Sequence, residues 1–361
     1  MIIKTDRKNQ FRAFFDPTSG FYMRTGIIKD GKDTGEDPFM TVFPELLDVG
    51  IMGSCAHGRL GLCAASGVEC YQNGAGVCQP DMKLEDFRRI AEECREKTFQ
   101  FALGGRGDPD MHPNFREILE CCRENSIVPN FTTSGLGMTR EKAELCKEFC
   151  GAVAVSWYRQ PHTLNALKLL LEAGVKTNIH FVLGQNTIGE AAELLKNGGF
   201  PRGINAVIFL LHKPVGSGSR GNMLKYGDER LVDFLEFIDE NEFPFGIGFD
   251  SCSAPALISY MKNTDRDSFD TCEGGRWSAY ITPDMKLLPC SFDNDKLRWA
   301  YDISCDTIEN GWNSPQFEDF RNRLRSSCPD CPERSSCMGG CPICPEIVLC
   351  GKRRQSHEVQ D

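Results

Sequence analysis

The sequence has no long apolar run, and none of its hydrophobic stretches approaches the about 18 residues that suggest a membrane-spanning helix. Its N-terminus, MIIKTDRKNQ, has no apolar core and so does not resemble a signal peptide. Positive charge is also scarce, with 41 lysines and arginines against 51 aspartates and glutamates and a net charge of -10. This balance argues against nucleic acid or an anionic membrane surface as the main partner. We therefore expect a cytoplasmic protein that binds neither.

Cysteine, by contrast, is abundant, because the 361 residues include 19 cysteines. In a reducing cytosol, clustered cysteines more often bind metal or act in catalysis than form disulfides. We expect the cysteines on helix-like segments to be packing residues or surface thiols, and these are Cys94, Cys121, Cys122, Cys146 and Cys150. The clustered cysteines elsewhere need a chemical explanation.

One cysteine group directly follows a run, Leu46 to Met52, that is typical of a buried strand. Cys55, Cys63 and Cys70 are spaced C-x7-C-x6-C on a glycine-rich loop. Thiolates are soft ligands that suit iron–sulfur clusters or zinc. Three ligands leave one coordination position open, which is where chemistry occurs at a metal. Taken alone, the triplet is equally consistent with three buried free cysteines.

Short apolar runs alternate with amphipathic stretches from residue 46 to residue 250. This alternation predicts βαβ units and a parallel sheet. The expected strands are 46–52, 98–104, 127–133, 151–157, 175–183, 205–211 and 245–250, and the expected helices are 83–97, 114–125, 139–150, 163–174 and 228–242. Six or seven such units suit a full or partial β/α barrel, whose functional residues collect at the C-terminal ends of the strands. The cysteine triplet follows the first strand, where such a site would lie.

The loop after the second expected strand, residues 104–113, is rich in glycine and contains Asp108. Glycines let a ligand approach the backbone, and a carboxylate accepts hydrogen bonds from an ammonium group. A turn that caps the next helix explains the same residues. Ser156 after the fourth strand is equally ambiguous. Asn178 and His180 lie on the same face of the fifth strand, and a single histidine on a strand is usually a core residue with its hydrogen bonds satisfied.

Two other features are weaker indications of a site. Residues 216–221 match GxGxxG after a strand, but Pro214 interrupts the strand-to-turn step and no helix follows at once. We therefore do not expect a dinucleotide site there. Asp250 is a candidate acid or base near the barrel mouth, and a helix or turn cap explains it equally well.

After the seventh strand the alternation stops and the cysteines return. Residues 278–288 predict a β-hairpin between Cys272 and Cys290, with Cys252 before it and Cys305 after it. The tail has a C-x2-C-x5-C-x3-C spacing followed by two more cysteines, and its members are Cys328, Cys331, Cys337, Cys341, Cys344 and Cys350. Such a short segment, rich in proline, glycine and serine, folds around metal rather than around a hydrophobic core. Structural zinc is an alternative that the spacing leaves open.

Together these features resemble the radical S-adenosylmethionine (SAM) enzymes that carry a C-terminal SPASM domain, over roughly Pro44 to Cys350. The spacing of the tail cysteines matches the SPASM motif. Residues 105–115, GRGDPDMHPNF, line up with the GGGEP-type segment of the family, with Asp108 in place of the usual glutamate. The likeness therefore rests on two motifs that lie far apart in the chain.

The first cysteine motif departs from the common C-x3-C-x2-C of the family, because each spacer is four residues longer. The adjacent pair Cys70 and Tyr71 matches the family pattern. The sequences of residues 61–74 and 272–292 resemble those of a subgroup that matures Cys-rich ribosomal peptides.

The resemblance implies an α/β fold with two main parts. Residues 43–251 would form a partial (β/α)6-type radical SAM barrel, and residues 252–350 a small Cys-rich SPASM domain that binds auxiliary iron–sulfur clusters. Residues 1–42 would be a strand-and-turn extension, too short for a full winged-helix leader-binding domain, and residues 351–361 a polar tail.

The resemblance also implies roles for the residues after the first strands. Cys55, Cys63 and Cys70 would bind three irons of a catalytic four-iron cluster, whose fourth iron chelates the amino and carboxylate groups of SAM. Gly107 and Asp108 would hold that amino group. The remaining cofactor-binding residues would be Gly105, Tyr71, Ser156 and Asn178, the last two facing the carboxylate or the ribose.

Two auxiliary four-iron clusters would complete a set of three. The first would use Cys272, Cys290 and Cys341, with Cys252 or Cys305 as fourth ligand or with that position open for a substrate thiol. The second would use Cys328, Cys331 and Cys337, closed by Cys350 or Cys344. Neither choice of fourth ligand follows from spacing.

The implied function is that of a peptide maturase, an oxidoreductase in the broad sense. SAM would be cleaved reductively to a 5′-deoxyadenosyl radical, which abstracts hydrogen from a ribosomal precursor peptide, and we expect a cysteine thioether to form. Carbon–carbon crosslinking, formylglycine formation and epimerisation are alternatives, and a zinc-stapled, non-catalytic binding protein is an alternative of another class. The partners would be the precursor peptide and an electron donor of the flavodoxin or ferredoxin type.

Overall fold

The computed structural model describes residues 1–351, apart from the side chains of residues 335 and 336. Its main element is a ten-stranded sheet in the order β12-β11-β10-β9-β8-β7-β6-β13-β14-β15. Seven neighbouring strands run parallel, as the seven apolar runs predict; they are β6 (Leu46–Met52), β7 (Gln100–Gly105), β8 (Val128–Thr133), β9 (Val153–Ser156), β10 (Thr177–Leu183), β11 (Ala206–Leu211) and β12 (Gly246–Phe249).

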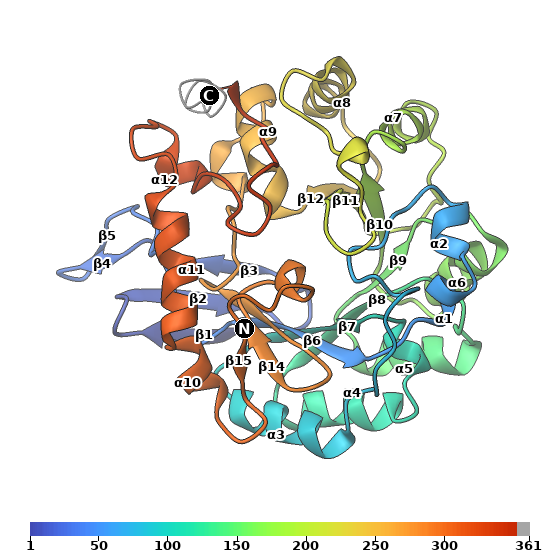
Figure 1. The fold of residues 1–361 in the computed structure, drawn as a ribbon, viewed down its shortest axis with the longest axis horizontal. Coiled ribbons are helices and arrows are strands. Elements are labelled where there is room, and N and C mark those ends of the chain that lie inside the picture. Colours follow the sequence, from blue (N-terminus) through green and yellow to red (C-terminus); the bar gives the residue numbers. More distant parts are fainter. Residues whose placement is uncertain (352–361) are drawn as a thin grey trace.

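Helices follow the first six of these strands and lie on the outside of the curved sheet (Figure 1). They are α3 (Leu84–Cys94), α4 (Phe115–Glu124), α5 (Arg140–Phe149), α6 (Pro161–Glu172), α7 (Ile188–Lys196) and α8 (Glu229–Glu240). Alternate residues of β6 explain the arrangement, because Leu47, Val49 and Ile51 are completely buried on one face. Six β/α units and a seventh strand confirm the predicted partial barrel.

The predicted hairpin extends the barrel sheet instead of standing apart from it. β13 (Ser278–Ile281) pairs in parallel with β6, and β14 (Lys286–Leu288) and β15 (Tyr301–Asp302) continue the sheet as antiparallel strands. The expected domain boundary at residue 252 therefore does not interrupt the sheet.

The remaining helices are short or belong to the C-terminal part. They are α1 (Ala56–Arg59), α2 (Leu62–Ala65), α9 (Ala254–Tyr260), α10 (Ile308–Trp312), α11 (Pro315–Ser326) and α12 (Arg334–Cys337), with 3-10 turns at Pro109–Met111, Arg220–Asn222, Ser251–Ser253, Arg266–Ser268 and Ser291–Asp293. None of the helices within residues 1–351 is long and apolar enough to cross a membrane. Apart from Gly351, the expected polar tail lies outside the described residues.

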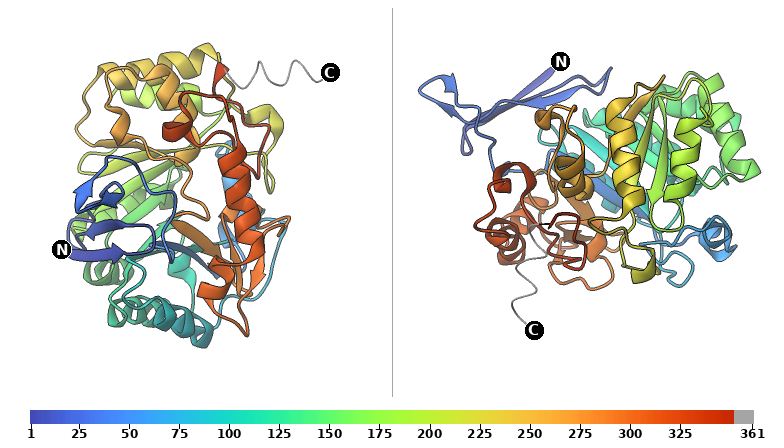
Figure 2. Two further views of the ribbon diagram at one scale, coloured as in Figure 1. Left: turned by 90° about the vertical axis from the view of Figure 1, so that its left-hand side faces the viewer. Right: turned by 90° about the horizontal axis from the view of Figure 1, so that it is seen from above.

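The first residues form a separate antiparallel sheet beside the barrel (Figure 2). Its strands are β1 (Ile2–Asp6), β2 (Phe11–Phe15) and β3 (Tyr22–Arg24), and a hairpin of β4 (Ile28–Lys29) and β5 (Lys32–Asp33) follows. Phe11 and Phe15 pack with Phe99, Val128 and Trp277 in a small apolar cluster. Because Phe99 precedes β7 and Val128 begins β8, this sheet covers the amino-terminal end of the barrel strands.

The cysteines predicted to be packing or surface residues lie on the barrel helices. Cys94, Cys121, Cys122 and Cys146 are buried among apolar side chains, and Cys150 at the end of α5 is half-buried. Burial raises the pKa of Cys94 to about 12, so this thiol is neutral at physiological pH.

Candidate functional site

Cys55, Cys63 and Cys70 come together at the carboxyl end of β6. Cys55 caps α1, with its Sγ accepting a hydrogen bond from the Gly58 amide at 3.1 Å. Burial, with smaller contributions from the neighbouring thiols of Cys70 and Cys55, raises the pKa of Cys63 to about 12. The three thiols are therefore electrostatic neighbours, although eight and seven positions separate them along the chain.

The long spacers of this motif fold into the two short helices α1 and α2. The Cys63 thiol lies 3.0 Å from Nδ1 of His57 and 3.8 Å from the hydroxyl of Tyr158, which follows β9. The rings of His57 and Tyr158 stack with their centroids 4.4 Å apart. The extra residues thus dock Cys63 against the neighbouring part of the barrel instead of looping freely.

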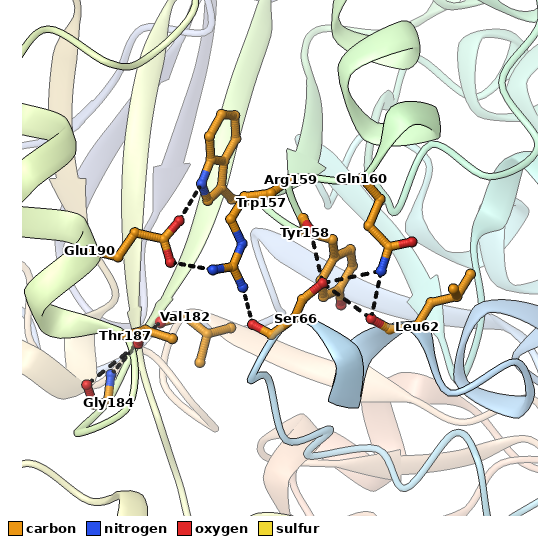
Figure 3. A network of polar contacts seen from close by, with 10 residues as sticks. All are labelled: Leu62, Ser66, Trp157, Tyr158, Arg159, Gln160, Val182, Gly184, Thr187 and Glu190. Carbon is orange, nitrogen blue, oxygen red and sulfur yellow. Dashed lines mark hydrogen bonds and ion pairs between the residues drawn. The ribbon is translucent and has the colours of Figure 1, made fainter.

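A polar network fixes the end of α2 to the loop after β9 (Figure 3). Arg159 donates to Glu190 at 2.6 Å and also to the carbonyl of Ser66. The Ser66 hydroxyl donates to the carbonyl of Tyr158 at 2.8 Å, and Gln160 donates to the carbonyl of Leu62 at 3.1 Å. Because α2 carries Cys63, this network holds the second cysteine of the motif in place.

A second loop packs closely on the first cysteine. A Cβ on Gly107 would lie 2.2 Å from the Ser54 carbonyl oxygen, and one on Gly74 would lie 2.8 Å from Cβ of Cys55. Gly105, with φ of 110°, has the Met52 carbonyl oxygen 2.3 Å from the position of a Cβ. Only glycine lets the loops after β6 and β7 approach this closely.

Asp108 lies at the same edge of the barrel, and its carboxylate is already hydrogen-bonded to Ser134. Its carboxylate accepts hydrogen bonds from the Ser134 amide, at 2.8 Å, and from the Ser134 hydroxyl. Burial raises the pKa of Asp108 to about 6, and the neighbouring Asp110 contributes. A carboxylate has about four acceptor positions, so Asp108 can still accept from a ligand ammonium group.

The GxGxxG loop supports the third cysteine. The Ser217 amide donates to the Cys70 carbonyl at 2.9 Å, and the Cys70 amide donates to the Ser217 hydroxyl at 2.9 Å. Gly216 has φ of 63°, and a Cβ there would lie 2.3 Å from the Tyr71 carbonyl oxygen. The loop therefore packs on the backbone of residues 70 and 71, in keeping with the weak case for a dinucleotide site.

Not every predicted cofactor residue reaches this edge. Ser156 is the last residue of β9 and lies opposite His180 of β10. Asn178, in contrast, is the second residue of β10, and its side-chain oxygen accepts a hydrogen bond from Asn205, which precedes β11, at 2.7 Å. Asn178 therefore lies at the amino end of the barrel, and its expected role is not supported.

Polar residues in the barrel interior escaped the sequence analysis. Gln72 Nε2 and Arg106 Nε are buried and have no hydrogen-bond partner within residues 1–351. Asp48 of β6 lies opposite Tyr280 of β13, and burial raises the pKa of Asp48 to about 7. Arg106 and Asp48 both influence the pKa of Tyr280, which burial raises. The available signal was Asp48, a charged residue on an otherwise apolar strand.

The tail cysteines surround a cavity of about 390 Å³. The cysteines in its wall are Cys328, Cys331, Cys337 and Cys350. Cys344 is not among them, because it is buried beside Cys341, whose Sγ accepts from the Cys344 amide at 3.3 Å. Four thiols around one space of this size fit an iron–sulfur cluster.

A second, smaller cavity of about 40 Å³ brings the other cysteines together. Cys252, Cys272 and Cys341 line it, together with Cys337, which also lines the larger cavity, and the pKa of Cys290, raised mainly by burial, is also raised by Cys272 and Cys341. Cys305, the alternative fourth ligand, is exposed and lies beside Ser304 instead.

Within the described part of the chain, no three histidine, cysteine, aspartate or glutamate side chains converge as ligands of a single metal ion. A four-iron cluster has a different requirement, because each thiolate binds its own iron.

Comparisons with known proteins address the fold and the C-terminal segment. Residues 272–332 match the SPASM family, described as an iron–sulfur cluster-binding domain. The fold is similar to that of Streptococcus suis SuiB bound to S-adenosylmethionine, with a TM-score of 0.63 and 15% identity over 86% of this chain and 77% of SuiB. It is also similar to anSMEcpe with bound AdoMet, with a TM-score of 0.59 and 16% identity over 87% of this chain and 92% of the other.

These comparisons confirm the resemblance inferred from the two motifs. The SPASM match covers residues 272–332, which lie within the segment 252–350 expected to form that domain. The chain has the fold of the radical SAM enzymes that carry a C-terminal SPASM domain.

Proposed function

We propose that the protein is a radical SAM enzyme that modifies a ribosomally made peptide by forming a thioether between a cysteine sulfur and a carbon of another residue. The observation that carries the proposal is the close packing of the loop containing Gly107 against Ser54 and Cys55 at the carboxyl edge of the barrel, on the segment that also carries Cys63 and Cys70. That edge is where β/α barrels place their active sites.

Two solved structures of the same fold support a peptide substrate. SuiB, with a TM-score of 0.64 and 15% identity over 86% of this chain and 76% of that chain, was solved bound to the precursor peptide SuiA. A structure of anSMEcpe was solved with AdoMet and the Cp18Cys peptide, with a TM-score of 0.57 and 16% identity over 87% of this chain and 95% of that chain.

Each part of the site has a defined task in this proposal. Cys55, Cys63 and Cys70 hold the catalytic cluster, and Gly107 and Asp108 receive the amino group of SAM. When bound, the cluster and SAM supply a 5′-deoxyadenosyl radical that takes one hydrogen atom from the peptide. The barrel walls exclude water from the reacting groups.

The auxiliary sites suit the electron balance of thioether formation. A new C–S bond replaces one C–H and one S–H bond, so the peptide loses one hydrogen atom, one proton and one electron. In this proposal, clusters bound in the two cysteine cavities would receive that electron. We assign Cys350 to the larger cavity and Cys252 to the smaller one, because each residue lines the cavity to which it is assigned. Cys344 and Cys305 are left out of the two sets.

Incubation of a candidate Cys-rich precursor with reduced enzyme and SAM tests the proposal. We expect a peptide that has lost two hydrogens per crosslink and one iodoacetamide-reactive thiol per crosslink, stable to reductant. A Cys55/Cys63/Cys70→Ala triple variant is the control and should leave the peptide unchanged. Loss of two hydrogens with all thiols still reactive would instead indicate a carbon–carbon bond, and an unchanged mass would contradict crosslinking.

A further inference from the structure

Lys213 is a buried cation at the end of β11 that the proposed chemistry does not use. Only 1% of its side chain is exposed. Its Nζ donates to Asp250 at 2.6 Å and to the Leu211 carbonyl at 3.0 Å, and it lies 4.3 Å from the centre of the Phe292 ring. The ammonium group is therefore held on three sides by these contacts.

Asp250 is equally fixed. Its carboxylate accepts from the Leu211 amide at 3.2 Å and from the Ser253 hydroxyl at 2.9 Å, in addition to Lys213. It is thus committed to an ion pair and to a hydrogen bond with a side chain of the turn that follows β12, which argues against a free acid or base.

The pair lies beside the segments that carry two of the cysteines assigned to the smaller site. Asp250 is two residues before Cys252, and Phe292, under the Lys213 ammonium, is two residues after Cys290.

The two charges have different neighbours. The Lys213 ammonium lies over Phe292, in the segment that begins at Cys290, whereas the Asp250 carboxylate is bound by Leu211 and Ser253 as well as by the lysine. A buried pair like this contributes little to stability, because desolvation offsets the attraction.

We propose that Lys213 raises the reduction potential of the iron–sulfur cluster held by Cys252, Cys272, Cys290 and Cys341, and that Asp250 orients the lysine and limits its effect. This inference rests on the proposed function for the presence of that cluster. A cation beside a cluster favours its reduced, more negative form, and burial weakens solvent screening of the interaction. Lys213 is a positioning and tuning residue here, because nothing places it in contact with the peptide or SAM.

A redox titration of reconstituted protein, followed by electron paramagnetic resonance, tests this. The Cys55/Cys63/Cys70→Ala background removes the signal of the catalytic cluster and leaves the two auxiliary ones. We expect Lys213→Met to lower the reduction potential of one auxiliary cluster by about 59 mV. For a one-electron couple, this shift changes the ratio of oxidised to reduced cluster about tenfold. Lys213→Arg, which keeps the charge, should titrate close to the unsubstituted protein.

Asp250→Asn should shift the potential in the opposite direction. This second variant tests the proposal even if Lys213→Met does not assemble its clusters. Removing the carboxylate leaves the lysine uncompensated, so the same potential should rise. The second auxiliary cluster, in the cavity of Cys328 and Cys331, should not move in any variant.

Two results would contradict the inference, and they differ in what else they overturn. Full iron content with unmoved potentials in Lys213→Met and Asp250→Asn would reject the role of Lys213 and leave the proposed function intact. Zinc in place of iron in the unsubstituted protein would reject both.

Discussion

Replacement of Gly107 by alanine is expected to reduce SAM cleavage by about a hundredfold or more and to release iron from the catalytic site. The added Cβ would lie 2.2 Å from the Ser54 carbonyl oxygen and 3.3 Å from Cα of Cys55. Both contacts are with backbone, so one of the two loops must move. A displacement of about 1 Å in a catalytic arrangement can cost about 10²-fold in rate.

Gly104 provides a matched control three residues earlier on the same segment. A Cβ there would meet no atom within 4 Å. Gly104→Ala should therefore retain its iron, whereas Gly107→Ala should lose it, as measured by iron and sulfide analysis with circular dichroism to confirm folding. Full iron content and normal 5′-deoxyadenosine formation in Gly107→Ala would show that the close approach of the two loops is not required.

The double variant Cys328→Ala/Cys331→Ala is expected to lose about four irons of about twelve and to melt at a lower temperature. The segment that surrounds the 390 Å³ cavity would be stabilised by a cluster bound to its cysteines, because metal binding contributes folding free energy to such short segments. SAM cleavage without peptide should continue, because the catalytic cysteines are untouched, while peptide crosslinking should stop.

Cys305→Ala is the control for this double variant. Cys305 is exposed and lies in neither cavity wall, so its replacement should leave iron content, melting temperature and crosslinking unchanged. Loss of four irons from Cys305→Ala, or none from the double variant, would show that the ligand sets are assigned wrongly.

Much of the fold could be predicted because the strands carry strong local signals. Six of the seven parallel strands lie within the expected runs, β7 ends one residue beyond its run, and β6 begins and ends at Leu46 and Met52 as predicted. α7 (Ile188–Lys196) was not singled out, and neither was β1, because both segments are short. That β13 continues the barrel sheet depends on pairing with β6, a contact across more than 200 residues that no local pattern reveals.

Fewer of the site residues could be predicted. The periodicity of a strand indicates on which face a residue lies more reliably than it indicates near which end of the strand the residue lies. Asn178 was placed on the correct face, but as the second residue of β10 it lies at the amino end of the barrel. Tyr158 and Arg159 were missed, although an aromatic and a charged residue directly after β9 lie where barrel sites form. Their role in holding α2 follows from contacts between loops and not from either sequence segment alone.

The fourth ligands of the auxiliary sites illustrate the same limit. Spacing allowed either Cys350 or Cys344, and either Cys252 or Cys305. The fold distinguishes Cys350 from Cys344, because Cys350 lines the larger cavity while Cys344 lies beside Cys341. Lys213 and Asp250, in turn, meet only because β11 and β12 are neighbours in the sheet.

The most direct test of the account is an anaerobic measurement that needs no peptide. The reconstituted protein is analysed for iron and sulfide, then given dithionite and SAM, in parallel with the Cys55/Cys63/Cys70→Ala variant. We predict about twelve irons and abortive 5′-deoxyadenosine for the unsubstituted protein, and about four fewer irons with no 5′-deoxyadenosine for the variant. Zinc without iron, or iron without 5′-deoxyadenosine in the unsubstituted protein, would contradict the account and favour a non-catalytic binding protein.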